Sequence, residues 1–165
     1  MVMAALVETS TVRISEQPGF IVVGYRVRTT NAAEATPNGQ IGKLWQRISS
    51  DRALEHIPNR ADSNIYAVYT DYETDENGPY TFVLGVKVSK DPIPAHGMVS
   101  QRVLPGRYAL FESEAGAAQE VVIRTWKRIW SWPDRSKRLY KTDYEVHSPN
   151  ANPNDARVTI FIGVK

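Results

Sequence analysis

The chain contains no cysteine, which excludes a disulfide framework, a thiolate nucleophile and a cysteine-ligated metal centre. It also lacks any apolar run close to the length of about 18 residues that crosses a bilayer, and residues 1–7 lack the basic start and full apolar core of a signal peptide. The net charge is only +2, far from the basic excess typical of proteins that bind phosphate backbones. These absences predict a soluble cytoplasmic protein without a membrane segment or a direct nucleic-acid partner.

Catalytic and cofactor motifs are also missing. No GxSxG, GxGxxG or Walker pattern occurs. His56, His96 and His147 lie far apart and lack the spacing of metal ligands. We therefore expect neither a metal site nor a cofactor.

What the chain does contain is one plan of strands and helices written twice. With 165 residues, 42% of them hydrophobic, it suits a single domain. The first half predicts strands over 11–15 and 20–27, a helix over 41–48, and strands over 64–72 and 80–88. The second half predicts strands over 98–104 and 107–113, a helix carrying Val122, Trp126, Ile129 and Trp130, and strands over 140–147 and 157–165.

Anchors in the two halves match in order, which indicates an internal duplication. Pro18-Gly19 corresponds to Pro105-Gly106, Trp45 to Trp126, and Gly85 to Gly163. We place repeat 1 at about 7–88, a connector at 89–97 and repeat 2 at about 98–165. Neither half alone could cover its own sheet, so we predict an α+β domain: one antiparallel sheet from both halves, one long helix per half, and a pocket near a pseudo-two-fold axis.

The tetrapeptide TDYE occurs twice, at 70–73 and 142–145. Glu73 falls near the tip of the hairpin at Asn77-Gly78, where side chains reach water, whereas Glu145 lies further along its sheet, about opposite Thr159. Strand alternation puts Asp143, Glu145 and His147 on one face and Tyr144 with Val146 on the other. Either the polar triplet faces solvent, or Glu145 lines an internal cavity.

The chain holds four tryptophans and eight tyrosines, which could form the walls of such a cavity around Glu145. A buried carboxylate without a partner should have a raised pKa or require a cation, and aromatic faces attract organic cations. Core packing remains the alternative for Trp45 and Trp126, and only one of Tyr66 and Tyr69 can face a given side of a strand. The candidate ligand-binding residues are Glu145, Trp45, Tyr69, Tyr66, Phe82, Tyr108, Trp126, Trp130 and His147.

Seven segments in order resemble one known family. They are PGFIVVGYRV, IGKLWQRI, NIYAVYTDYETDENGPYTFVLGVKV, GMVSQRVLPGRYALF, TWKRIWSW, TDYEVH and VTIFIGVK. The set resembles the GyrI-like, AraC-type effector-binding family, particularly its stand-alone integron-associated, YdeE-like members. The resemblance implies two strand-helix-strand-strand modules around a pocket for drug-like, often cationic molecules, with the acid of a late-strand [DE]-[FY]-E-x-[YH] pattern, here Glu145, at the pocket centre. His147 stands where many members have tyrosine.

Three function classes follow. The leading one is small-molecule effector binding by a sensor without its own DNA-binding domain, any role in transcription then needing a separate DNA-binding or regulatory partner chain. The second, implied by the resemblance, is hydrolysis of reactive electrophiles with Glu145 as general base, a role that a raised pKa would suit. The third is a protein-interaction role such as topoisomerase inhibition, for which the acidic run Asp71, Glu73, Asp75 and Glu76 is the candidate surface.

A basic cluster extends along and after the second predicted helix, and we interpret it as a solvated face, with binding of an acidic partner as the alternative. Its members are Arg124, Lys127, Arg128, Arg135, Lys137, Arg138 and Lys141.

Overall fold

The computed structural model describes residues 12–90, 92–149 and 152–165, so the predicted start of repeat 1 at residue 7 lies outside the described residues. An antiparallel sheet of 8 strands runs in the order β1-β6-β8-β7-β3-β4-β2-β5. The strands are β1 (Arg13–Gln17), β2 (Phe20–Thr29), β3 (Ile65–Thr70), β4 (Tyr80–Val88), β5 (Val99–Val103), β6 (Gly106–Glu112), β7 (Arg138–His147) and β8 (Val158–Val164). The α-helices are α1 (Asn31–Glu34), α2 (Ile41–Asp51) and α3 (Ala118–Trp130), and the 3-10 helices are η2 (Ala53–His56), η3 (Arg135–Lys137) and η4 (Pro153–Asp155). The predicted α+β class is confirmed.

Local chemistry explains where the elements differ from the predicted ranges. Strand β3 ends at Thr70, two residues early, because Asp71 adopts a left-handed backbone with φ of 51° that leaves the ladder. The short helix α1 was missed inside a polar stretch, although Thr30 marks its start: the Thr30 hydroxyl accepts a hydrogen bond from the backbone N–H of Ala33. Helix α3 ends at Trp130, before Pro133.

The strand order reads the same from both edges when β1, β2, β3 and β4 are exchanged for β5, β6, β7 and β8. Strands β3 and β7 pair at the centre, and each half gives its first strand to the other half, since β1 pairs with β6 and β5 with β2 at the opposite edge. A doubled module with its pseudo-two-fold axis between β3 and β7 would produce this order. The boundaries given above for the two repeats stay a prediction.

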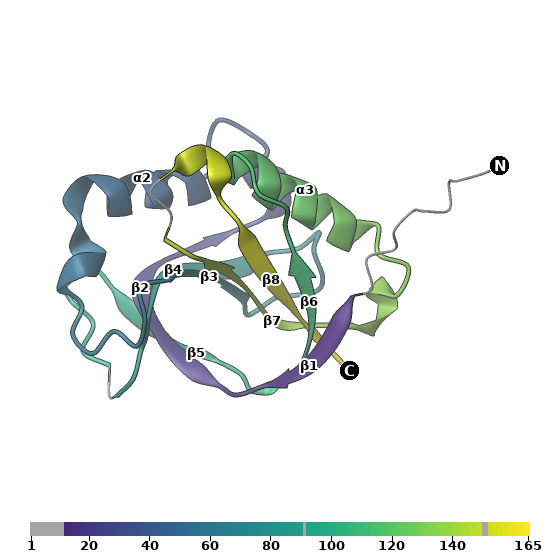
Figure 1. Ribbon diagram of the computed structural model, residues 1–165, viewed down its shortest axis with the longest axis horizontal. Coiled ribbons are helices and arrows are strands. Elements are labelled where there is room, and N and C mark those ends of the chain that lie inside the picture. The colour runs from purple at the N-terminus through teal and green to yellow at the C-terminus, as the bar shows by residue number, and fades with distance from the viewer. Residues whose placement is uncertain (1–11, 91, 150–151) are drawn as a thin grey trace.

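Helices α2 and α3 lie side by side over one face of the sheet (Figure 1). Beneath α2, Leu44 and Ile48 pack on a core that includes Phe82, and beneath α3, Trp126 and Ile129 pack on a second core. The sheet is strongly curved, and its two edge strands, β1 and β5, come toward each other on the side opposite the helices (Figure 1). The curl encloses a third, helix-free cluster: Val22, Tyr66, Val68, Val83, Val103, Tyr108, Leu110 and Tyr144. Both faces of the central strands are therefore buried.

Candidate functional site

Glu145 lies near the C-terminal end of β7, between Ala67 of β3 and Ile160 of β8. The predicted partner was Thr159, and the register differs by one residue because β8 begins at Val158 instead of Arg157. Glu145 is only 2% exposed and points to the helix-covered face, while Tyr144 packs within the curl on the other face. The alternation of faces is confirmed, and the alternative in which the polar triplet faces solvent is wrong.

Three side chains donate hydrogen bonds to the carboxylate of Glu145. The Tyr69 hydroxyl and the Trp126 indole Nε1–H both donate to Oε2, each over 2.7 Å. His147 Nε2 lies 2.7 Å from Oε1, and because a carboxylate only accepts, Nε2 carries the proton in this contact. The donors come from both halves: Tyr69 from β3, Trp126 from α3 and His147 from β7.

The electrostatics of Glu145 differ from the expectation of a raised pKa. Burial alone raises the pKa of this carboxyl, as the sequence argument assumed. The hydrogen bond and the charge of His147, with the hydrogen bonds from Trp126 and Tyr69, outweigh burial, and the pKa lies below its ordinary value. Burial, followed by the Glu145 charge, raises the pKa of Tyr69 well above its usual range. Glu145 is thus an anion beside a neutral tyrosine.

A second buried carboxylate, Asp143, lies two residues earlier on the same face. Its Oδ2 accepts from the Tyr72 hydroxyl at 2.6 Å and from Arg138 Nη2 at 2.9 Å, and its Oδ1 accepts from the backbone N–H of Gly163 at 2.9 Å. Arg138 is thereby removed from the solvated basic face that the sequence predicted, because its guanidinium is buried against this aspartate. Asp143 is paired with a permanently charged guanidinium, whereas the partner of Glu145, His147, is charged only when it is protonated.

A cavity of about 660 Å³ opens between α2 and α3 beside Glu145. Its walls come from four elements: Ile41, Gly42, Trp45, Gln46 and Ser49 of α2, Ala118, Gln119, Val122 and Ile123 of α3, Tyr69 of β3, and Glu145 with His147 of β7. The Trp45 ring packs edge-to-face on His147, with ring centroids 4.8 Å apart. The cavity combines apolar and aromatic walls with one buried anion, a combination suited to a lipophilic guest.

A smaller compartment of about 220 Å³ adjoins this cavity and shares the Ile41, Tyr69, Val122 and Ile123 walls with it. Trp126 and Trp130 form its side toward α3, and Tyr72 and Tyr80 form its side toward the sheet. Trp130 is 43% exposed, so it forms part of the rim and not of a core.

The structure brings together six of the nine candidate residues. Glu145, Trp45, Tyr69 and His147 line the main cavity, and Trp126 and Trp130 line the adjoining compartment. Three others lie elsewhere. Phe82 is buried behind Tyr69, at 5.1 Å between ring centroids, and contacts neither cavity.

The prediction that Tyr66 and Tyr108 line the cavity is also wrong, because both belong to the cluster inside the curl, on the face opposite the helices. The Tyr66 hydroxyl donates to Asp62 at 2.6 Å, and the Tyr108 hydroxyl donates to the carbonyl of Leu104. Tyr66 and Tyr69 are three residues apart on one strand, so they face opposite sides, and Tyr69 is the one at the cavity.

Sequence reasoning missed the helix residues that complete the wall. Ile41 and Ser49 lie one turn on either side of Trp45, and Val122 lies one turn before Trp126, so the neighbours of the two tryptophans at i±4 carried a usable signal. The Tyr72–Asp143–Arg138 network gave no such signal, because it depends on an irregular stretch of β7 between Arg138 and Asp143.

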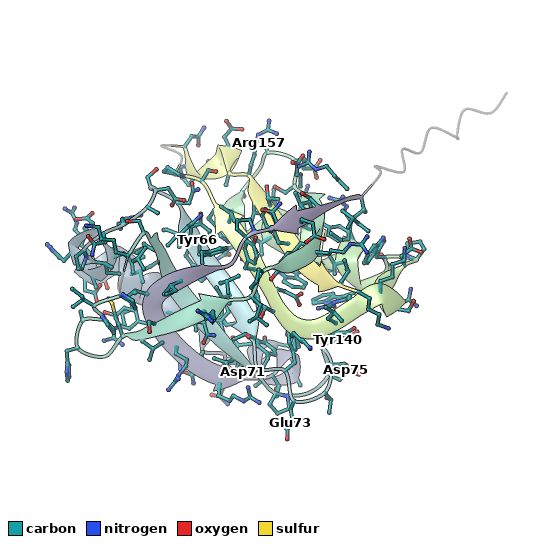
Figure 2. All side chains as sticks on the ribbon, turned by 90° about the horizontal axis from the view of Figure 1, so that it is seen from below. Tyr66, Asp71, Glu73, Asp75, Tyr140 and Arg157 are labelled. Atoms are coloured by element: carbon teal, nitrogen blue, oxygen red, sulfur yellow. The ribbon has the colours of Figure 1, made fainter. Side chains whose placement is uncertain are left out.

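The acidic run does not line the main cavity, although its last member, Glu76, lines the smaller compartment. Asp71, Glu73 and Asp75 follow β3 at one end of the molecule, far from Arg157 at the other end (Figure 2). Glu73 is exposed, as its place near the hairpin tip predicted. Within residues 12–90, 92–149 and 152–165, no helix is long and apolar enough to cross a membrane.

Comparison with known proteins places the chain among effector-binding proteins. Residues 13–164 match the family model described as integron-associated effector binding protein. The Bacillus subtilis (strain 168) protein YobU, named as a transcriptional regulator, is 34% identical over 144 residues, covering 86% of this chain and 90% of YobU.

Solved structures show the same fold. The integron cassette protein VCH_CASS2 from the mobile metagenome of Vibrio cholerae superposes with a TM-score of 0.75 at 31% identity, covering 94% of this chain and 97% of that protein. SAV2435, solved bound to tetraphenylphosphonium, superposes with a TM-score of 0.74 at 15% identity, covering 94% of each chain. The fold and the family model, which spans nearly all described residues, agree: this chain belongs to the family of integron-associated effector binding proteins.

Proposed function

We propose that this protein binds organic cations or cationic amphiphiles in the cavity beside Glu145, as the ligand-binding part of a regulatory system. The observation that carries the proposal is a buried carboxylate with a lowered pKa in the wall of a 660 Å³ cavity. An ionised group in such surroundings attracts an opposite charge more strongly than it would in water. The likeness to SAV2435 supports this choice of ligand, and the likeness to YobU supports a regulatory setting.

The aromatic walls add a preference for bulky, delocalised cations. Trp45 and Tyr69 line the main cavity, and Trp126 and Trp130 line the compartment next to it. Each aromatic face contributes about 0.5 to 2 kcal/mol to binding of an organic cation. A small inorganic cation would gain less, because it would give up strong hydration without filling the space.

The same geometry favours binding over hydrolysis. A general base works best with a pKa near the working pH and a free lone pair aimed at the attacking water. Glu145 has a lowered pKa, and three donors occupy its two oxygens. The carboxylate is therefore a weak base, and three hydrogen bonds already engage its two oxygens.

Substitution Glu145→Gln tests the proposal, because it removes the charge and keeps the shape. We expect binding of tetraphenylphosphonium to weaken by about 1 to 3 kcal/mol, roughly 5- to 150-fold in Kd, since a charged partner is lost. Binding of the neutral analogue triphenylphosphine oxide should change little. Both affinities can be measured by quenching of tryptophan fluorescence, since Trp45 lines the cavity.

The second TDYE copy supplies a matched control. Glu73→Gln makes the same chemical change in the same tetrapeptide, on an exposed loop, and should leave both affinities at the wild-type value. Equal losses for the cation and the neutral analogue in Glu145→Gln, or no loss for the cation, would contradict the proposal.

A further inference from the structure

Glu145 already has a potential counter-ion within its own strand. Of its three hydrogen-bond donors, only His147 can carry a positive charge, since Trp126 donates through a neutral indole and the raised pKa of Tyr69 keeps its hydroxyl neutral. The short contact of 2.7 Å joins His147 Nε2 to Oε1, the oxygen that neither other donor uses.

The three donors also differ in how firmly they are held. Tyr69 packs against Tyr80, Phe82 and Trp126, and Trp126 is a buried residue of α3. His147 is the last residue of β7, with 17% of its side chain exposed, and packs on Trp45 in the cavity wall. Of the three donors, His147 therefore needs the least free energy to move away from Glu145.

No other charged side chain lines the main cavity among the described residues, and the charged residues of the adjoining compartment are Glu34, Glu76 and Arg138. The cavity residues of α2 and α3 are uncharged, and β3 contributes only Tyr69. Strand β8 places Val158 opposite His147, and β3 places Ile65 on its other side. The nearest buried cation, Arg138, is committed to Asp143. Among the described residues that line the cavity, Glu145 and His147 thus decide the charge.

We propose that His147 is the specificity-determining residue of the site: as an internal cation it competes with the ligand for Glu145, so that an organic cation binds with release of the histidine proton. This inference rests on the proposed function of the cavity. With His147 protonated, the pair is neutral, and a guest cation would leave one uncompensated positive charge in an apolar site. Transfer of that proton to solvent restores neutrality, and the neutral ring then donates to Oε1 or turns aside.

The consequence is a charge preference that changes with pH. Histidines change charge between about pH 5 and 8, so the cavity should favour cations at the upper end of this range and neutral guests equally throughout it. A tyrosine at this position would provide a donor that stays neutral and would remove the competition.

The test is a titration of the full chain with tetraphenylphosphonium between pH 5.5 and 8.5, by calorimetry in two buffers with different ionisation enthalpies. At the acid end we expect the wild type to release close to one proton per cation bound and to gain about tenfold in affinity per pH unit, as linkage of one proton requires. His147→Gln and His147→Tyr should bind with pH-independent affinity and without proton release. Triphenylphosphine oxide should show neither effect with any variant, and circular dichroism checks that each variant is folded.

The outcomes separate the two proposals. Proton release that persists in both His147 variants, or a pH-independent wild type that still depends on Glu145, would overturn the role of His147 and leave cation binding intact. Absence of tetraphenylphosphonium binding to the wild type at pH 8.5 would overturn both.

Discussion

At the residue scale, the main problem is to hold an ionised carboxylate in an apolar interior. Glu145 is buried among rings, and isolated burial would neutralise it. Two neutral donors and one histidine satisfy its oxygens. Because the two neutral donors share Oε2, the charge is stabilised from one side while Oε1 faces the single exchangeable partner.

Substitution Tyr69→Phe removes one of these donors and keeps the ring. We expect the free energy of unfolding to fall by about 1 to 3 kcal/mol, because a buried charged acceptor loses a hydrogen bond. Urea unfolding measures the change. Tyr66→Phe on the same strand is the control, since it also removes a hydroxyl bonded to a carboxylate, but Asp62 is half-buried and water can replace the lost donor. Losses of equal size in the two variants would contradict the assigned importance of Glu145.

At the scale of the element, the range of β4 was predicted correctly, whereas the side of the sheet on which each aromatic residue lies was predicted only in part. Strand β4 has the predicted range 80–88, because a run rich in β-forming residues follows a strong Asn-Gly turn signal. Tyr66 and Tyr108 were assigned to the cavity wrongly, because the curl of the sheet buries both faces and aromatic content then no longer identifies the cavity side. Glu145 and His147 were placed together correctly, since strand alternation puts residues i and i+2 on one face.

The strand pair β2–β4 depends on two glycines that face each other. Gly24 pairs with Gly85, and a Cβ atom on Gly85 would lie 2.0 Å from the carbonyl oxygen of Val23. Backbone atoms cannot move aside as side chains do, so this position accepts no side chain without shifting the strand. The close approach of β2 and β4 therefore requires glycine at this pair of positions.

We therefore expect Gly85→Ala to lower the free energy of unfolding by about 1 to 3 kcal/mol, as overpacked cores do. Gly42 in α2 is the control, because a Cβ atom there would meet nothing within 4 Å. Gly42→Ala should raise stability by up to about 1 kcal/mol through helix propensity. The denaturant midpoints of the two variants measure both changes. A Gly85→Ala variant as stable as the wild type would show that β2 and β4 can move apart without a loss of stability.

At the scale of the whole molecule, the site lies where the two halves meet. Tyr69 comes from the first half, while Trp126, His147 and Glu145 come from the second, and the cavity lies between one helix of each. The sequence predicted this position from the duplicated anchors. It could not supply the distances, since these depend on the β3–β7 register, which pairs Ala67 with Glu145.

Acid should weaken this junction. The pKa of Glu145 is lower in the folded chain than its ordinary value of 4.5, so its ionisation stabilises the fold fully above about pH 4.5. That contribution is lost as the pH falls below 4.5 and through the lower folded-state value. Urea unfolding between pH 3 and 7 should show a steeper decline for the wild type than for Glu145→Gln. Parallel curves would mean that the carboxylate contributes nothing to acid sensitivity.

The pairing of the first strand of each half with the other half affects how a ligand would act on the fold. Because β1 completes the edge beside β6 and β5 completes the edge beside β2, neither half can detach without breaking a ladder of the other. A molecule bound between α2 and α3 would contact both halves of this interlocked sheet, and its binding free energy would add to the stability of the entire chain. The proposed ligand would thus stabilise both halves together, so loss of the ligand would loosen the two halves as one unit.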